Sequence, residues 1–173
     1  MTVTCRQARV EDIEGISAVR IRSWQEGYRG ILPGDYLAAL SVRAEVERWR
    51  SALAGRGLRP GHSVAVVDGE IVGWSSVGPY RDEDVPPPGP DAGEINAIYV
   101  LPERWGAGIG RALMAHALQE LAAGGLSPVL LWVLRDNTRA RRFYQRAGFR
   151  PDGVTQLYEV GGAVLPELRY RYG

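Results

Sequence analysis

With 173 residues, 45% of them hydrophobic and 24% charged, the chain has the size and composition of one globular domain that folds without disulfides or metal. Its net charge of +1 argues against a nucleic-acid partner, and its single cysteine, Cys5, excludes an internal disulfide and favours a reducing compartment. The sequence shows no metal-site spacing of cysteines and histidines, no membrane-spanning apolar run and no signal peptide, so we expect a cytoplasmic protein.

The first half of the chain predicts a strand, three helical segments and a hairpin, at residues 3–8, 11–26, 35–40, 41–54 and 63–77. Glu11 and Asp12 suit the first turn of a helix, and Ser41 is a good N-cap for another. Asp68-Gly69 readily adopts the two positive φ angles of a type I′ turn, which predicts the hairpin.

The second half predicts a strand, a helix, a strand, a helix and a hairpin, at residues 94–100, 108–123, 129–134, 138–147 and 154–172. Four residues, Ala140, Phe143, Tyr144 and Ala147, have the spacing of one buried helical face, and Gly148 sits where a helix ends in the left-handed conformation. Because meander strands precede a strand–helix–strand unit, we expect an α/β fold with a mixed sheet.

A glycine-rich loop lies between a predicted strand and a predicted helix: Gly106-Ala107-Gly108-Ile109-Gly110-Arg111. At a helix N-terminus, free backbone N–H groups and the helix dipole make a site for pyrophosphate. A dinucleotide fingerprint fails because Ile109, Arg111 and Leu113 occupy its glycine positions, and a Walker loop fails for lack of a lysine. The alternative is a glycine-rich turn without a ligand.

Residues 97–114 resemble the acetyl-CoA signature of the GNAT superfamily of N-acetyltransferases, Arg/Gln-x-x-Gly-x-Gly/Ala, except that Trp105 stands where the family prefers Arg or Gln. A second stretch, Asn137-x-x-Ala140-x-x-Phe143-Tyr144-x-x-x-Gly148-Phe149, is similar to the second cofactor motif of that family. The resemblance extends over nearly the whole chain and is most specific over residues 94–149.

The resemblance implies one N-acetyltransferase domain over residues 1–173. The implied fold is α/β, with a mixed, mostly antiparallel sheet of about seven strands flanked by four to five helices. It also implies acetyl-CoA as co-substrate, no metal, and a small-molecule or peptide amine as acceptor. Since dimers are common in the family, a homodimer is one expectation.

The implied cofactor-binding residues are Ile98, Tyr99, Val100, Trp105, Gly106, Ala107, Gly108, Ile109, Gly110, Arg111, Asn137, Ala140 and Tyr144. In the family, the strand backbone at 98–100 pairs with the pantetheine arm as another strand would. Asn137 would hydrogen-bond the pantetheine or the substrate, and Tyr144 would protonate the departing thiolate. The alternative for Tyr144 is a core aromatic residue.

Amine acetylation benefits from a base, because an ammonium has no lone pair with which to attack a thioester. Glu94, at the start of the cofactor strand, is the best candidate, and a solvated strand-edge residue is the alternative reading. Asp82, Glu83 and Asp84 are rival acids in a loop rich in proline, and His62 and His116 are weaker candidates. Cys5 is disfavoured as an acyl-carrying nucleophile, because no base can be assigned beside it.

An aromatic stretch between the first helices includes Trp24, Tyr28 and Tyr36. In this superfamily the region covers the acceptor site, so these residues are predicted to bind the substrate; the alternative is that they only pack the helices onto the sheet. The sequence therefore predicts an N-acetyltransferase. The competing interpretation is a non-catalytic acyl-CoA sensor or interaction module with the same fold.

Overall fold

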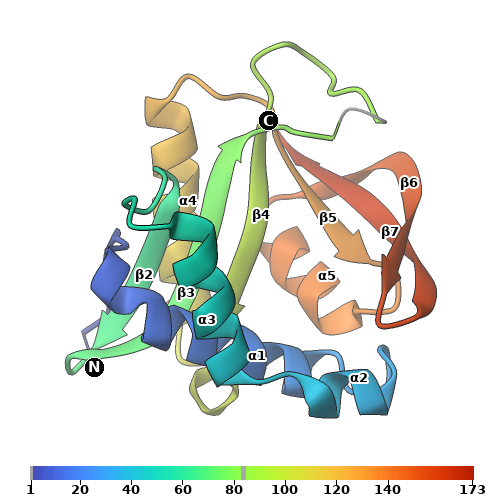
Figure 1. Cartoon of the computed structure of the whole chain (residues 1–173). Helices are drawn as coiled ribbons and strands as arrows, with labels where there is room; N and C mark the ends of the chain where they lie inside the picture. Colours follow the sequence, from blue (N-terminus) through green and yellow to red (C-terminus); the bar gives the residue numbers. More distant parts are fainter. Residues whose placement is uncertain (1, 83–84) are drawn as a thin grey trace.

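The computed structural model describes residues 2–82 and 85–173 and joins its strands in one seven-stranded sheet (Figure 1). The strands are β1 (Thr4–Gln7), β2 (His62–Val67), β3 (Glu70–Pro79), β4 (Gly93–Val100), β5 (Val129–Leu134), β6 (Arg150–Val160) and β7 (Ala163–Tyr172). The helices are α1 (Ile13–Gly27), α2 (Gly34–Ala39), α3 (Val42–Leu53), α4 (Ile109–Ala123) and α5 (Thr138–Arg146), with 3-10 turns at Val10–Asp12 and Pro102–Arg104. The expected α/β fold, with a seven-stranded sheet and five helices, is confirmed.

Local signals in the sequence account for most element boundaries. The Ser41 hydroxyl accepts a hydrogen bond from the Ala44 N–H at 3.4 Å and begins α3. Asp68 and Gly69 have φ angles of 50° and 81°, as the turn between β2 and β3 requires. The last hairpin differs from its prediction: β6 begins at Arg150 rather than 154, because residues 150–151 already pair with β7 before a bulge.

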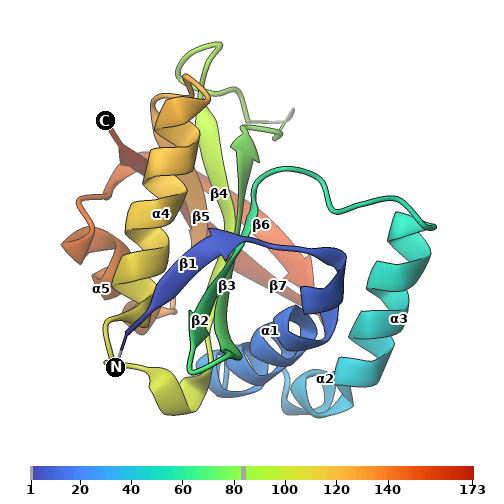
Figure 2. The ribbon, with the colours of Figure 1, turned by 90° about the vertical axis from the view of Figure 1, so that its left-hand side faces the viewer.

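The strand order is β1-β2-β3-β4-β5-β7-β6, and every neighbouring pair is antiparallel except β4 and β5. That parallel pair is connected through α4, because parallel strands need a crossover. Helices cover both faces of the sheet (Figure 2): α4 and α5 lie on one side, and α1 and α3 on the other. The sheet is therefore mixed and mostly antiparallel, as expected.

The parallel pair β4–β5 is joined at one end only. Its register contains two partner pairs, Gly93↔Val129 and Glu94↔Leu130, after which the strands separate. Figure 1 shows β4 and β5 leaving the same end of the sheet and diverging. A bulge in β4 at Asn96, an extra residue between two pairs with β3, bends the strand at this point. Most of β4 therefore presents a free edge to the gap.

The predicted buried face of α5 is only partly buried. Ala140, Phe143, Tyr144 and Ala147 pack against the core cluster that includes Phe149, but α5 contributes no fully buried side chain. The prediction of burial was wrong in degree, because the diverging strands leave a cavity beside this helix. The half-exposed face is thus available to a ligand.

A buried ion pair fastens the last hairpin to the long loop that precedes β4. The guanidinium of Arg169, which is 5% exposed, donates from Nε to Asp152 at 2.7 Å and from Nη1 to the Pro86 carbonyl at 3.0 Å. Its charge also lies 5.9 Å from the ring centres of Tyr80 and Trp132. One side chain on β7 therefore ties together three segments around the gap.

We expect Arg169→Met to lower the free energy of unfolding by about 3 kcal/mol, because it leaves the largely buried carboxylate of Asp152 without its counter-charge. Urea denaturation followed by circular dichroism measures the change. The double variant Arg169→Met/Asp152→Asn should recover part of the loss, since it removes both charges. Equal stability of wild type and the single variant would contradict the assigned role.

Candidate active site

Two cavities adjoin the gap between β4 and β5, and Tyr28 and Tyr99 line both of them. The first, here called the loop cavity, has a volume of ≈ 440 Å³ and extends over the glycine-rich loop and α5. The second, the aromatic cavity, has a volume of ≈ 500 Å³ and lies between α1, α3 and the sheet. The two tyrosines mark the point where the cavities meet.

The glycine-rich loop has the backbone that an anion site needs. Gly106 and Gly108 have φ angles of 81° and 84°, a conformation that other residues adopt only with strain. Gly108 caps α4, so the first N–H groups of that helix lack intrahelical partners. A Cβ on Gly110 would lie 3.2 Å from the Phe143 ring, so this glycine lets α4 and α5 approach.

Four arginines line the same cavity: Arg104, Arg111, Arg139 and Arg146. They come from the loop, from the first turn of α4 and from α5. Guanidinium groups bind phosphates in a bidentate geometry, and a helix N-terminus adds favourable dipoles. The loop cavity is therefore suited to a polyphosphate group.

Trp105, the departure from the family signature, has two partners. Its Nε1 donates to the Val100 carbonyl at 2.8 Å, and the Arg139 guanidinium lies 3.4 Å from its ring centre. The indole thus connects the loop to β4 and carries a cation on its face. At the position where the family signature prefers Arg or Gln, this chain therefore has an indole with a guanidinium from α5 on its ring.

The free edge of β4 offers backbone groups to the gap. The Leu101 N–H donates to Val72 on β3, whereas the Val100 carbonyl accepts from Trp105 and from the Ser23 hydroxyl at 2.8 Å. The backbone N–H and C=O groups of successive strand residues point to opposite edges of the strand. Those of Ile98 therefore point into the gap, as those of Val100 do. Two donors occupy the Val100 carbonyl, so the N–H of Val100 and both backbone groups of Ile98 are left for pairing.

The remaining predicted cofactor residues fall into two groups. Asn137, Ala140 and Tyr144 line the loop cavity, and Asn137 also caps α5 by accepting from the Ala140 N–H at 3.1 Å. By contrast, the side chain of Ile109 is 1% exposed and belongs to the core, and Ala107 does not line the cavity. Of Ile109, only the backbone is therefore available to a ligand.

Tyr144 lies on the loop-cavity side of the point where the cavities meet. Burial raises the pKa of its hydroxyl and the neighbouring Tyr99 adds to the rise, while Arg139 opposes it. The phenol is therefore protonated at neutral pH. A neutral phenol beside the open strand edge is placed to donate a proton.

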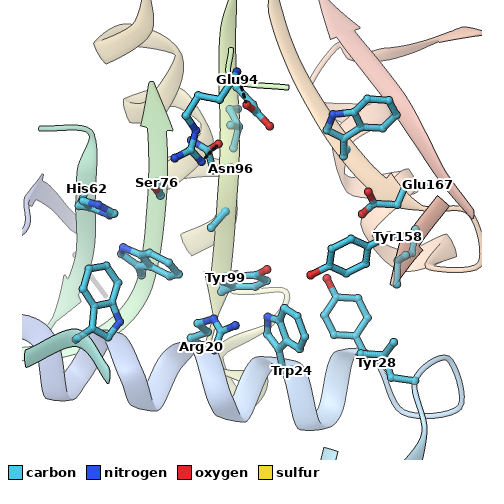
Figure 3. A pocket seen from close by; sticks show the side chains of 18 of the residues that line it. Arg20, Trp24, Tyr28, His62, Ser76, Glu94, Asn96, Tyr99, Tyr158 and Glu167 are labelled. Carbon is cyan, nitrogen blue, oxygen red and sulfur yellow. Dashed lines mark hydrogen bonds between the residues drawn. The ribbon is translucent and has the colours of Figure 1, made fainter. Parts of the chain in front are cut away.

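The aromatic cavity is lined by residues of α1, α3 and the strands β2 to β7 (Figure 3). Trp24 and Tyr28 line it from α1 and just beyond, as predicted. Tyr36 does not line it; it packs against Gly161 in the β6–β7 turn. The substrate-binding role of Tyr36 stays a prediction. Other lining aromatic residues had not been anticipated from the sequence: Trp49, Trp74, Trp132 and Tyr158.

Glu94 lies in the aromatic cavity near the closed end of the β4–β5 gap (Figure 3). Burial raises its pKa, although the Arg81 N–H, which donates to Oε2 at 3.3 Å, and the Arg81 charge oppose the rise. The Arg81 guanidinium itself donates to Asn96 at 2.6 Å. Glu94 is thus a half-buried carboxylate inside the cavity and not a solvated strand-edge residue.

The rival candidates lie in different surroundings. Asp82 accepts from the Val85 N–H at 3.2 Å, and Glu83 and Asp84 lie outside the described residues. His116, expected at the surface, is half-buried, with Nε2 3.2 Å from the Ser63 hydroxyl. Cys5 lines neither cavity, and burial raises the pKa of its thiol.

Sequence reasoning placed neither His62 nor Glu167 in the aromatic cavity. His62, ranked low as a base, stacks on Trp74 at 5.9 Å between ring centres, and burial lowers its pKa so that it is neutral. Glu167 lines the opposite wall from β7. An acid in the middle of an otherwise apolar strand segment, Val164–Leu168, was the available signal.

Residues 2–82 and 85–173 contain neither a cluster of metal-ligand side chains nor a helix that could span a membrane. No three histidine, cysteine, aspartate or glutamate side chains gather there as a metal ion would need. In the same part of the chain, no helix combines the length and apolar character needed to cross a bilayer.

Comparisons with a family model and with related proteins agree on one family. The model of the acetyltransferase (GNAT) family matches residues 21–149. The uncharacterized N-acetyltransferase YuaI of Bacillus subtilis is 36% identical over 167 residues, which cover 96% of this chain and 90% of that protein. A mycothiol acetyltransferase of Frankia alni is 40% identical over 135 residues, which cover 73% of this chain but 40% of that longer protein.

Among solved structures, the PaiA N-acetyltransferase from Thermoplasma acidophilum in complex with coenzyme A has a TM-score of 0.69. It is 21% identical, and the match covers 99% of this chain and 100% of that one. At this identity the likeness shows the fold.

Proposed function

Because the chain belongs to the GNAT acetyltransferase family, we propose that this enzyme transfers the acetyl group of acetyl-CoA to a primary amine by direct attack in a ternary complex. The observation that carries the proposal is the meeting of two unlike cavities at Tyr28 and Tyr99. One is basic and built around helix N–H groups; the other is aromatic and contains carboxylates. A single acetyltransferase domain over residues 1–173 is part of the proposal.

The loop cavity fits the cofactor. The pyrophosphate would lie on the N–H groups of residues 108–111, with Arg139 and the other three arginines around the phosphates. The pantetheine would pair with Ile98 and the Val100 N–H as an added strand, and the amide N–H₂ of Asn137 would donate to it. Coenzyme A in the Thermoplasma neighbour supports this assignment. The aromatic cavity then receives the acceptor.

The bound thioester supplies an electrophilic carbonyl carbon. The neutral amine attacks that carbon, the C–N bond forms and the C–S bond breaks. Before the attack, the ammonium loses a proton through water to Glu94. Tyr144 gives its proton to the departing thiolate and regains one from the nitrogen as the amide forms. A small-molecule or peptide amine is the proposed acceptor, while the cytoplasmic location and a homodimer stay predictions.

A panel of amines tests the proposal, with free thiol measured at each turnover: polyamines, aminoglycosides, amino acids, peptide N-termini and lysine. Amine-dependent release of CoA is the expected result. If acetyl-CoA binds and no amine releases CoA, the non-catalytic sensor becomes the better interpretation.

Arg139→Gln should weaken acetyl-CoA binding by about tenfold, because it removes a guanidinium from the phosphate site and from the Trp105 face. Isothermal titration calorimetry measures the dissociation constant. Arg142→Gln, on the same helix but exposed and outside the cavity, is the matched control and should bind as wild type does. Equal affinities of the two variants would remove Arg139 from the cofactor site.

Tyr144→Phe should lower kcat by about 100-fold and leave acetyl-CoA affinity within about twofold, because it removes one proton and little contact area. Stopped-flow or steady-state thiol release measures kcat, and calorimetry measures affinity. Tyr172→Phe, which removes an exposed hydroxyl, is the control. Unchanged turnover in Tyr144→Phe would show that another group protonates the thiolate.

Glu94→Gln should change the pH profile of kcat/KM. The base must be ionised to act, so in wild type kcat/KM rises with pH through the Glu94 pKa, which burial places above the ordinary 4.5. In the variant, the rise of kcat/KM through the Glu94 pKa should disappear, and kcat/KM at neutral pH should fall by about 100-fold. The dependence of kcat/KM on the ionisation of the amine near pH 10 should remain. Glu47→Gln, on the exposed face of α3, is the control. An unaltered profile would exclude Glu94 as the base.

A further inference from the structure

Three arginines and two glutamates line the aromatic cavity. Arg20 and Arg48 both contact the buried carboxylate of Glu45, at 3.1 Å and 2.6 Å. Arg81 and Glu94 are neighbours of opposite charge, as described above. Glu167 is the other carboxylate of the cavity lining, and in residues 2–82 and 85–173 it forms no ion pair.

Glu167 is half-buried and has one neutral hydrogen-bond partner, the Gln156 side chain, which donates to Oε2 at 3.0 Å. Its charged neighbours have the same sign: Glu94 across the cavity and Asp82 in the loop. Figure 3 shows the hydroxyl groups of Tyr28, Tyr99 and Tyr158 gathered below this carboxylate. A carboxylate withdrawn from water without a counter-charge favours a cation beside it.

The strand registers place Glu167 close to the reacting end of the cofactor site. Glu94 is level with Leu130, and Leu134, four residues further along β5, pairs with Glu167 on β7. Ile98 is likewise four residues beyond Glu94 on β4. At about 3.3 Å per residue, Glu167 lies about 13 Å beyond Glu94 along the strand direction, near the level of Ile98. Along the strand direction, Glu167 is therefore level with the segment proposed to pair with pantetheine, whereas Glu94 lies toward the closed end of the gap.

We propose that Glu167 binds the ammonium group of the acceptor and holds that nitrogen beside the thioester. The assignment rests on the proposed acetyl transfer and adds a recognition residue to it. The ammonium nitrogen donates to the Glu167 carboxylate, with the tyrosine hydroxyls as further partners. One N–H proton leaves through water toward Glu94, and the lone pair so freed attacks the carbonyl carbon. The two carboxylates thus have separate tasks set by their positions.

If Glu167 had a structural role, its replacement by glutamine would lower the stability of the fold, but its surroundings predict no such loss. Burial raises the pKa of Glu167, so the folded state binds its proton more tightly than the unfolded state does. For a raised carboxyl pKa, stability falls as pH rises through the unfolded and then the folded pKa, and the ionised form is a cost at neutral pH. Glu167→Gln should therefore leave the melting temperature unchanged or raise it. The charge is kept for binding.

The experiment compares Glu167→Gln with Glu159→Gln, an exposed glutamate on the same hairpin. With an acceptor found in the amine panel, Glu167→Gln should raise KM at least tenfold and change kcat less than about threefold, since the lost contact is present before and during attack. Glu159→Gln should match wild type. An unchanged KM in Glu167→Gln would overturn the proposal.

A second measurement does not depend on turnover. The CoA-bound protein is titrated with phenethylamine and with 2-phenylethanol, which differ by an ammonium in place of a hydroxyl. Wild type should bind the amine at least tenfold more tightly, and Glu167→Gln should bind both compounds alike. If wild type shows this preference but no amine is acetylated, acetyl transfer fails and the ammonium site stands. If amines are acetylated and both proteins show the same preference, the ammonium site alone fails.

Discussion

The separation of β4 from β5 is the constraint on which the rest of the site depends. Two residue pairs hold these parallel strands together, and the bulge at Asn96 then bends β4 away. A sheet that stayed paired would satisfy its own backbone groups and leave no place for a ligand between the strands. Because the gap opens, Ile98 and Val100 present unpaired backbone groups, α5 is only half-buried, and two cavities meet inside one sheet.

The charges of the two cavities are arranged for two different ligands. On one side, backbone N–H groups and arginines converge at the start of α4, which suits a polyanion. On the other, the arginines of the aromatic cavity lie beside Glu45 and Glu94, whereas the carboxylate of Glu167 forms no ion pair among the described residues. The negative end of one ligand and the positive end of the other are therefore drawn to opposite sides of the tyrosines at the junction.

Residues whose signal is local could be predicted from the sequence, and residues whose role depends on register could not. The Asp68-Gly69 turn, the Ser41 cap and the left-handed Gly148 need only their own neighbours. Glu167 becomes part of the site through two successive registers, β4 with β5 and β5 with β7, and no spacing in the chain encodes either. Trp105 shows the same limit. The sequence shows only that a tryptophan replaces the Arg or Gln of the family motif, whereas the fold brings the Arg139 guanidinium onto the indole ring.

The choice of cation has a chemical consequence in such an enzyme. All 21 basic side chains of the chain are arginines, and the sequence contains no lysine. A guanidinium stays protonated at neutral pH and is a poor acyl acceptor, whereas a lysine amine near a thioester loses its proton readily when desolvated. The groups proposed to hold the cofactor phosphates can therefore lie close to an activated acetyl group without competing for it. In the proposed reaction, the amine of the acceptor is then the nucleophile. The site binds this amine at Glu167 and also removes its proton.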